Sequence, residues 1–172
     1  MNRILNLMAT SLAALSLAAC ASVQKIDAAG DVHALLVSIR DGDDAAFDAH
    51  VDRPALEREI GARMTAELNK PSADPRLKML GALLGSSAAS LAGDALIRPK
   101  VFRTVAEYYG YREGQPLPGR MAIAGSLKEV GDGRVCATRK KGGPCLLLFT
   151  QEQGVWRLSG FEGETSMLRT GA

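Results

Sequence analysis

The chain has few of the residue types from which many catalytic and metal sites are built. Its 172 residues include two histidines, three cysteines and one tryptophan, and aromatic side chains make up only 5%. The histidines, His33 and His50, stand far apart, and neither has a Cys, a Glu or a second His at the spacing of a zinc motif. We therefore expect both to be structural residues on helices, and we predict no metal site.

A large excess of charge of one sign is also missing. The chain has 21 Lys and Arg against 19 Asp and Glu, and the basic residues are dispersed along it. This balance argues against nucleic-acid binding, which requires a basic patch or stripe. The sequence has no P-loop, no Gly-x-Ser-x-Gly elbow and no Gly-x-Gly-x-x-Gly that opens a helix. We therefore expect no enzymatic activity and no cofactor.

Beyond the N-terminus, no apolar run is long enough to span a bilayer. The uncharged stretch from Met79 to Gly93 contains three serines and falls short of the roughly 20 apolar residues that a spanning helix needs. Small residues recur in it at every fourth position, namely Gly81, Gly85, Ala89 and Gly93. Such a stripe favours close packing against another helix or the sheet, with docking to a partner or to the bilayer surface as the alternative.

The N-terminal segment has the parts of an export signal. Arg3 supplies a basic start, residues 4–17 form a short apolar region, and small residues precede Cys20. The segment is too short and too rich in Ala and Ser for a permanent membrane span. Cys20 is then either a modified residue or a small apolar residue near an ordinary secretory cleavage site.

The run Leu17-Ala18-Ala19-Cys20 resembles the lipobox of bacterial lipoproteins. In such lipoproteins the cysteine thiol receives a diacylglyceryl group, the signal is cut before the cysteine, and the new amine is acylated. The resemblance implies a signal peptide over residues 1–19, lipidation at Cys20, and attachment to the cell envelope on its periplasmic side. Ala21, in a position where Asp favours the inner membrane of Gram-negative bacteria, favours the outer membrane.

The spacing of apolar residues predicts a lipidated tether over residues 20–30 and then about five helices. The expected helices cover residues 31–41, 43–51, 53–68, 75–96 and 100–109. Gly42 is expected to end the first helix, and Asp43 and Asp52 to cap the second and third. Glu59, Arg63 and Glu67 form a charge ladder on the third helix, away from its apolar stripe.

After a loop at residues 114–119 the apolar period changes from 3.6 to 2. Met121, Ile123 and Leu127 stand at even spacings before a Gly-Asp-Gly turn, and strands are expected over residues 135–139, 145–150 and 155–161. Helices followed by a four-stranded antiparallel meander define an α+β domain, expected over residues 31–165 with a C-terminal tail at residues 166–172.

Cys136 and Cys145 are the remaining cysteines. A wide loop between their strands allows a disulfide, whereas a tight Gly142-Gly143 turn would set Cys136 opposite Phe149 and leave the thiols apart. We favour the disulfide, because an exported chain meets an oxidising compartment. The spacing gives no sign of redox catalysis.

A cluster of acidic residues invites comparison with a calcium site. Its members are Asp41, Asp43, Asp44, Asp48 and Asp52. The calcium loop requires Gly at its sixth position and usually Glu at its twelfth, but this chain has Ala46 and Asp52 there. We therefore interpret these residues as helix caps and a solvated turn.

Several segments resemble the bacterial family called domain of unknown function 2939. Residues 33–56 carry a helix, a Gly-Asp turn and a Val-Asp-x-Pro start to the next helix. Leu96-Ile97-Arg98-Pro99, Leu146-Leu147-Leu148 and Gly154-Val155-Trp156-Arg157-Leu158 follow in the family's order. The family has no assigned function, so the resemblance implies fold and context only. The arrangement is also similar to nuclear-transport-factor-2-like and cystatin-like folds, in which helices pack into a curved antiparallel sheet.

The sequence thus predicts a lipid-anchored envelope protein that acts as a non-enzymatic binding or accessory module. Its expected partners are the membrane, another envelope protein, or an apolar small molecule in a cleft between helices and sheet. Trp156 with Tyr108, Tyr109 and Tyr111 forms either the wall of such a cleft or core and rim, and we favour core for Trp156. An envelope hydrolase and a purely structural lipoprotein are the alternatives.

Overall fold

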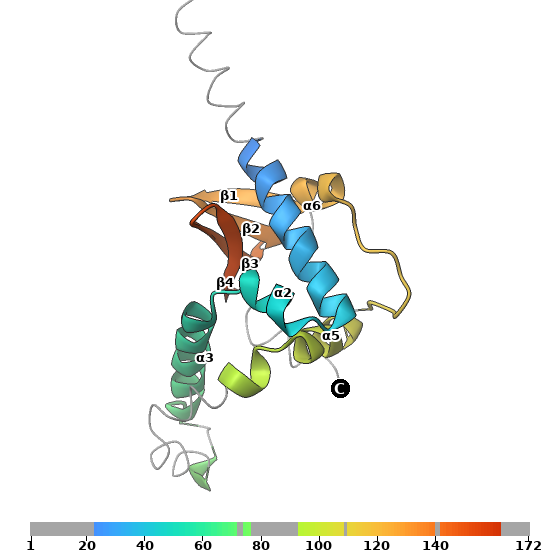
Figure 1. Ribbon diagram of the computed structural model, residues 1–172. Coiled ribbons are helices and arrows are strands. Elements are labelled where there is room, and N and C mark those ends of the chain that lie inside the picture. The colour runs from blue at the N-terminus through green and yellow to red at the C-terminus, as the bar shows by residue number, and fades with distance from the viewer. Residues whose placement is uncertain (1–22, 72–73, 77–92, 109, 140–141, 163–172) are drawn as a thin grey trace, which may run out of the picture.

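The structure, a computed structural model, describes residues 23–71, 74–76, 93–108, 110–139 and 142–162. N-terminal helices pack against a four-stranded antiparallel meander, which confirms the expected α+β class (Figure 1). In this described part, no helix combines the length and the apolar character needed to cross a membrane.

The first helix covers residues 23–41 and lies along the sheet (Figure 1). Ala28 and Ala29 are fully buried, and Val32 and Leu35 continue the buried face. Residues 23–30, which the sequence assigned to the lipidated tether of residues 20–30, thus belong to the first helix instead. The apolar stripe of this helix begins with Ala28 and Ala29. Their small side chains give little periodic signal in the sequence, but they let the helix approach the sheet closely.

Gly42 ends the first helix, as predicted. Its φ of 71° lies in the left-handed region, and the N–H of Asp43 donates to the carbonyl of Ser38 at 3.0 Å. The Arg103 guanidinium donates to the Ile39 carbonyl at 3.0 and 3.2 Å and also to the Arg40 carbonyl. A cation therefore satisfies two of the four carbonyls that a helix leaves unpaired at its C-terminus.

Two capped helices follow, and the segment between them joins the sheet. α2 spans Asp44–Ala49 and α3 spans Arg53–Leu68. Between them, Val51 forms a parallel bridge with Leu158, which also exchanges backbone hydrogen bonds of 2.9 Å with the flanking residues 50 and 52. The start of α3 is thus fixed at the edge of the sheet.

The fourth predicted helix falls mostly outside the described residues, including the small residues at positions 81, 85 and 89. Residues 75–76 and 93–96 are helical. At Gly93 a Cβ atom would lie 2.5 Å from Cγ of Glu57 on α3, so this member of the stripe packs closely against another helix. α5 spans Pro99–Tyr108, and its Phe102 ring meets Phe47 edge-on with centroids 5.2 Å apart.

A sixth helical segment replaces the start of the predicted first strand. α6 spans Arg120–Ser126, and only then does β1 begin, at Leu127–Gly131. Ile123 and Leu127, both buried, stand four residues apart, a spacing that fits either period. The strand prediction is therefore wrong for residues 121–126, where Ala and Met favour a helix.

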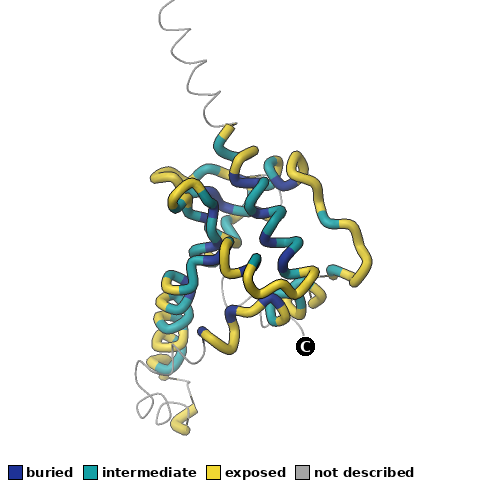
Figure 2. Tube along the Cα trace, in the orientation of Figure 1, coloured by how far each residue is buried: buried dark blue, intermediate teal, exposed yellow. Residues whose placement is uncertain are grey.

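The remaining strands agree with the predicted segments. β2 spans Arg134–Thr138, β3 spans Cys145–Glu152 and β4 spans Val155–Phe161, in the sheet order β1-β2-β3-β4. Val135, Phe149 and Leu158 lie opposite one another across three strands and are buried. Together with Phe47 and Trp156 they fill the layer between sheet and helices, where Figure 2 shows the buried residues.

The two members of an ion pair on α3 both contact the last strand. Arg63 donates to Glu59 Oε1 at 2.7 Å and to the carbonyl of Phe161, and its guanidinium carbon lies 4.5 Å from the Phe161 ring centroid. Glu59 Oε2 accepts the Phe161 N–H at 3.0 Å, and a Cβ on Gly160 would lie 2.7 Å from this oxygen. The pair predicted as part of a surface ladder therefore connects helix to sheet.

The cap at Gly42 gives the first testable prediction. Gly42→Ala is expected to lower the free energy of unfolding by about 1 kcal/mol, because a Cβ is disfavoured at positive φ. Gly42→Asn should cost less, since Asn tolerates this region. Gly125→Ala is the matched control: it lies in α6 with nothing within 4 Å of its added Cβ, and it should be neutral or stabilising. Equal effects of Gly42→Ala and Gly125→Ala in urea unfolding would contradict the assignment.

Candidate functional site

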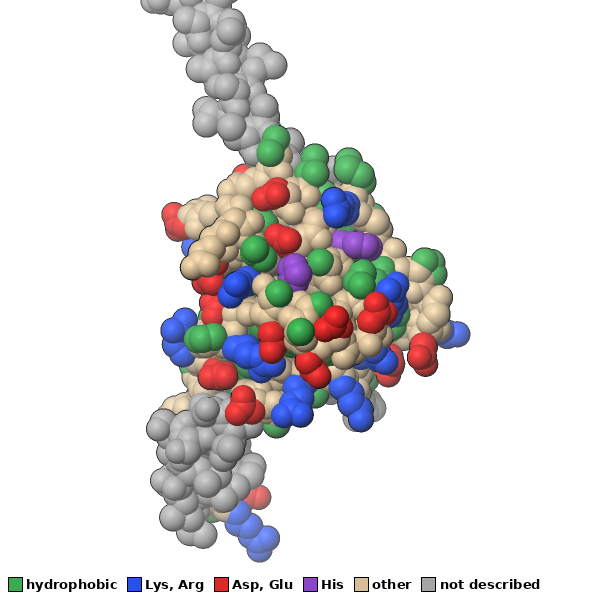
Figure 3. Space-filling view, viewed as in Figure 1, with side chains coloured by type: hydrophobic (Ala, Val, Ile, Leu, Met, Phe, Trp, Pro, Cys, Tyr) green, Lys and Arg blue, Asp and Glu red, His purple; other side chains and the backbone are tan. Residues whose placement is uncertain are grey.

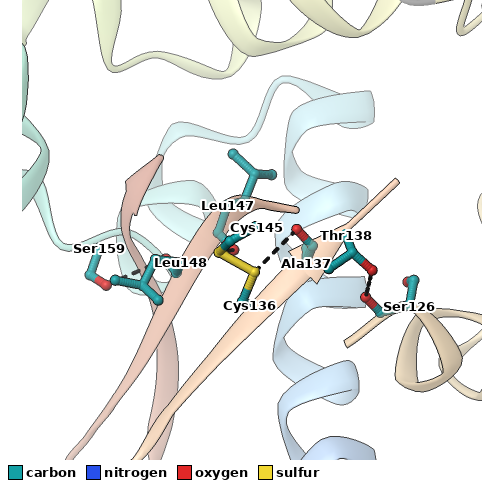
Figure 4. The surroundings of a disulfide bond; sticks show 8 residues. All are labelled: Ser126, Cys136, Ala137, Thr138, Cys145, Leu147, Leu148 and Ser159. Carbon is teal, nitrogen blue, oxygen red and sulfur yellow. Dashed lines mark hydrogen bonds between the residues drawn. A yellow bond between two sulfur atoms is a disulfide. The ribbon is translucent and has the colours of Figure 1, made fainter. Parts of the chain in front are cut away.

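The two cysteines of the sheet form a disulfide, as predicted (Figure 4). Cys136 pairs with Leu148 and Thr138 pairs with Cys145, and the register shifts between Ala137 and Thr138. This shift brings the cysteine Cα atoms to 5.5 Å. The alternative turn, which would have set Cys136 opposite Phe149, is wrong because residue 149 pairs with residue 135. Cys136 is fully buried, so the bond acts as a staple within the sheet.

The acidic cluster serves helix termini and local ion pairs. Asp43 accepts the N–H of Ala46 and Asp52 accepts that of Ala55, each at 3.0 Å. Both capping predictions are thus confirmed. Asp48 accepts from Arg53 at 2.6 and 2.9 Å. Within the described ranges, no group of three or more His, Cys, Asp or Glu residues is placed to hold a metal ion.

Asp41 is paired with its neighbour Arg40. The guanidinium donates to both carboxylate oxygens, at 2.7 and 3.0 Å. These hydrogen bonds lower the pKa of Asp41 below its ordinary value, and the same contact raises the pKa of Arg40. Because the pair is solvent-exposed, it contributes little to stability.

Two carboxylates of the first helix converge on the start of β4, and they form the main polar cluster between elements. Asp27 Oδ2 accepts the indole Nε1–H of Trp156 at 2.9 Å and the side-chain amide of Gln151 at 3.3 Å. Asp31 Oδ2 accepts the backbone N–H of Trp156 at 2.8 Å. Asp27 and Asp31 stand one turn apart, so both face the same side of the helix. They satisfy both donors of a fully buried tryptophan.

His50 completes this cluster from the C-terminal end of α2. Its Nε2 lies 3.6 Å from Asp31 Oδ1, and its Nδ1 lies 2.9 Å from the carbonyl of Ala46. The N–H at Nδ1 donates to this carbonyl, since a carbonyl only accepts. When Nε2 is protonated it forms an ion pair with Asp31. The cluster of Asp27, Asp31, His50, Gln151 and Trp156 is called the Trp156 cluster below.

A histidine beside a carboxylate is also the core of many acid–base sites. A histidine that activates a serine, threonine or cysteine nucleophile is hydrogen-bonded to its hydroxyl or thiol. Among the described residues, the polar partners of His50 are the Ala46 carbonyl and Asp31. The second carboxylate oxygen of Asp31 accepts a hydrogen bond from the backbone N–H of Trp156. These contacts join the first helix, α2 and β4.

The other predicted residues lie apart from this cluster. His33 Nδ1 is 3.1 Å from the carbonyl of Pro118, and the two histidine side chains stand separately on the face shown in Figure 3. Trp156 belongs to the core, as favoured, whereas Tyr108 is exposed and Tyr111 is half-buried. Tyr109 and the lipidation candidate Cys20 lie outside the described residues. On the face in Figure 3 acidic and basic side chains alternate, without a large patch of one sign.

Asp27 and Asp31 were not predicted to be members of a cluster. Asp27 fell in the predicted tether and Asp31 at the expected start of the first helix. Their spacing of four residues is a real signal for one helix face. It becomes informative only once the helix is known to begin before residue 27.

The fold and the Trp156 cluster define an α+β protein in which partly buried polar contacts hold an N-terminal helix on a meander sheet. Residues 11–105 match the family described as "Protein of unknown function (DUF2939)", and because this is more than half of the chain, the chain belongs to that family. The match ends within α5, ahead of α6 and the sheet, so the family-like segments at residues 146–148 and 154–158 lie outside it. No curated protein and no solved structure matches the chain.

Removing the Asp31 carboxylate tests the cluster. Asp31→Ala should lower the free energy of unfolding by about 1–3 kcal/mol, because the Trp156 N–H loses its acceptor. Asp31→Asn retains an accepting oxygen and should lose less. Glu113→Ala, at an exposed loop position, is the control and should stay within about 0.5 kcal/mol of the wild type. Unfolding of Asp31→Ala at the same denaturant concentration as this control would show that the contact contributes nothing.

Metal addition tests the interpretation of the acidic cluster. Micromolar Ca²⁺ or Zn²⁺ is expected to leave the melting temperature unchanged, because the Asp43 and Asp52 carboxylates are used as caps and Asp48 is paired with Arg53. A ligand that binds only the folded state raises this temperature by mass action. A rise at micromolar metal would therefore contradict the prediction.

Proposed function

We propose that the protein is a lipid-anchored component of the bacterial cell envelope. In this proposal Cys20 carries the acyl chains, residues 1–19 are removed, and the domain faces the periplasm, most readily from the outer membrane. The observation that carries the proposal is the run Leu17-Ala18-Ala19-Cys20 behind a basic start and a short apolar segment. Acyl chains contribute about 0.8 kcal/mol per buried methylene, so two or three chains would anchor the protein stably.

Within the envelope we propose a non-enzymatic role as a binding or accessory module. The arrangement of the Trp156 cluster supports this role. Asp27 and Asp31 accept hydrogen bonds from Trp156. The Nδ1–H of His50 donates to the Ala46 carbonyl. The side chains between the helices and the sheet, including Phe47 and Phe149, are buried as core. These contacts favour a stable scaffold that presents its outer surface to a partner.

Replacing the cysteine tests the anchor. The full chain and its Cys20→Ala and Ser22→Ala variants would be expressed in a bacterial host with labelled palmitate. We expect label and membrane association in the wild type and in Ser22→Ala, the matched control two residues away. Cys20→Ala should carry no label, and it should be released as soluble periplasmic protein or remain uncleaved. Density fractionation of the wild type reports inner or outer membrane.

A Cys20→Ala product that is correctly processed and remains on the membrane would overturn the anchor.

Crosslinking in intact envelopes tests the proposed role as a binding or accessory module. A defined crosslinked neighbour that disappears with Cys20→Ala supports an accessory role at the membrane. Monomeric protein at every crosslinker length supports a purely structural lipoprotein instead.

A further inference from the structure

The N-terminal end of the first helix presents apolar side chains that do not enter the core. Val23 is 66% exposed and Ile26 is 47% exposed, whereas Ala28 and Ala29, in the next turn, are fully buried. Val23 and Ile26 stand three residues apart and therefore lie on one side of the helix. Figure 3 shows hydrophobic side chains gathered at the end of the domain where the first helix begins.

Covalent geometry fixes how far this end can lie from a lipid anchor. Only Ala21 and Ser22 separate Cys20 from Val23. Three fully extended residue steps span at most about 11 Å, whatever conformation they adopt. The interfacial layer on each side of the hydrocarbon core is about 5–8 Å thick. With acyl chains on Cys20 inserted, Val23 would thus lie in or next to the headgroup layer, and Ile26 only about 4.5 Å further along the helix.

A second element extends the same end of the domain. The Arg120 guanidinium lies 3.8 Å from the position of a Cβ on Gly30, so the start of α6 is beside the first helix. Met121 follows Arg120 and is 72% exposed, the largest exposed fraction among the large apolar residues of the described chain. In Figure 1, α6 lies near the end of the domain where the first helix begins.

The charges at this end suit an anionic lipid surface. Lys25 stands in the first turn between the two exposed apolar residues, and Arg120 stands next to Met121. Asp27, the acid in the same turn, is turned toward Trp156 and Gln151. Apolar side chains flanked by Lys and Arg are typical of segments that lie in the membrane interface, where the long basic side chains reach the headgroups.

We propose that Val23, Ile26 and Met121, with Lys25 and Arg120, form a membrane-docking face that rests on the phospholipid bilayer. This inference rests on the proposed lipid anchor and adds an orientation to it. The anchor and the face together hold the domain in one pose. In that pose α3, which extends from the opposite end in Figure 1, points away from the bilayer.

Spin labels on introduced cysteines test the pose. The acylated protein would be reconstituted in phosphatidylethanolamine and phosphatidylglycerol vesicles, with single labels in Ile26→Cys, Met121→Cys or Val105→Cys. Cys136 and Cys145 are bonded to each other and do not react. Val105 on α5 is the matched control, because its exposed fraction of 47% equals that of Ile26. Power saturation with oxygen and with a water-soluble nickel chelate reports the depth of each label.

We expect the labels at positions 26 and 121 to lose accessibility to the nickel chelate when vesicles are present, while the label at 105 keeps it. Adding Val23→Asp and Ile26→Asp should return the label at 121 to water without loss of acylation. Protection at 26 alone would reflect proximity to the anchor and would overturn the docking face. Equal nickel accessibility at all three positions would overturn it as well.

Flotation of the same samples separates the two proposals. If the protein floats with the vesicles but the label at 121 remains in water, the anchor stands and the docking face fails. If the wild-type protein does not float, the proposed anchor is wrong, and the docking face, which rests on it, is wrong too. Floating protein with the label at 121 protected supports both.

Discussion

The structure depends on how its first helix is held against the sheet. The helix approaches closely because Ala28 and Ala29 put only methyl groups in the interface, and both are fully buried. This burial covers Trp156, whose indole and backbone N–H groups would each cost about 1–3 kcal/mol if left without a partner. Asp27 and Asp31 supply the two acceptors. Apolar packing and hydrogen bonding therefore require the same placement of the helix.

This placement makes the N-terminus of the domain stiff. A helix usually frays in its first turn, because its first N–H groups have no partner within the helix. Here fraying as far as Asp27 would expose the indole N–H of Trp156, so the second turn is held by a contact to β4. The first described residue, Val23, belongs to the same helix. Residues 23–41 therefore form one helix, which the contact of its second turn to β4 holds on the sheet.

The sequence was most informative where structure is decided by neighbouring residues. Gly42, Asp43 and Asp52 act through backbone groups within a few positions, and the predicted helix end and caps were confirmed. The hairpin strands followed from short polar turns and a period of two. The disulfide was predictable in kind but not in geometry, because a register shift between residues 137 and 138 sets the cysteine separation.

Features that depend on distant partners were not predictable in the same way. The Glu59–Arg63 pair has the spacing of an ordinary surface ion pair, and nothing local indicates that it binds the backbone at residue 161. Asp27 looks like a solvated residue until Trp156, far along the chain, is placed beside it. α6 was missed because Ile123 and Leu127 fit a helix and a strand equally well. Each of these depends on which segments meet after the chain has folded.

The position of α3 gives the proposed orientation a consequence. Leu56 is its one buried residue, so burial contributes little to a helix of 16 residues. Helices of this length are marginal alone in water. Among the described residues, the contacts that hold α3 are the Asp52 cap, the bridge before it, the packing of Glu57 against Gly93 and the fastening of Glu59 and Arg63 to β4, all in its first three turns. In Figure 1 the turns beyond residue 63 project from the domain, and Met64 there is 39% exposed. A domain that rests on the membrane by its N-terminal end would offer this part of α3 to the periplasm, at the greatest distance from the lipid.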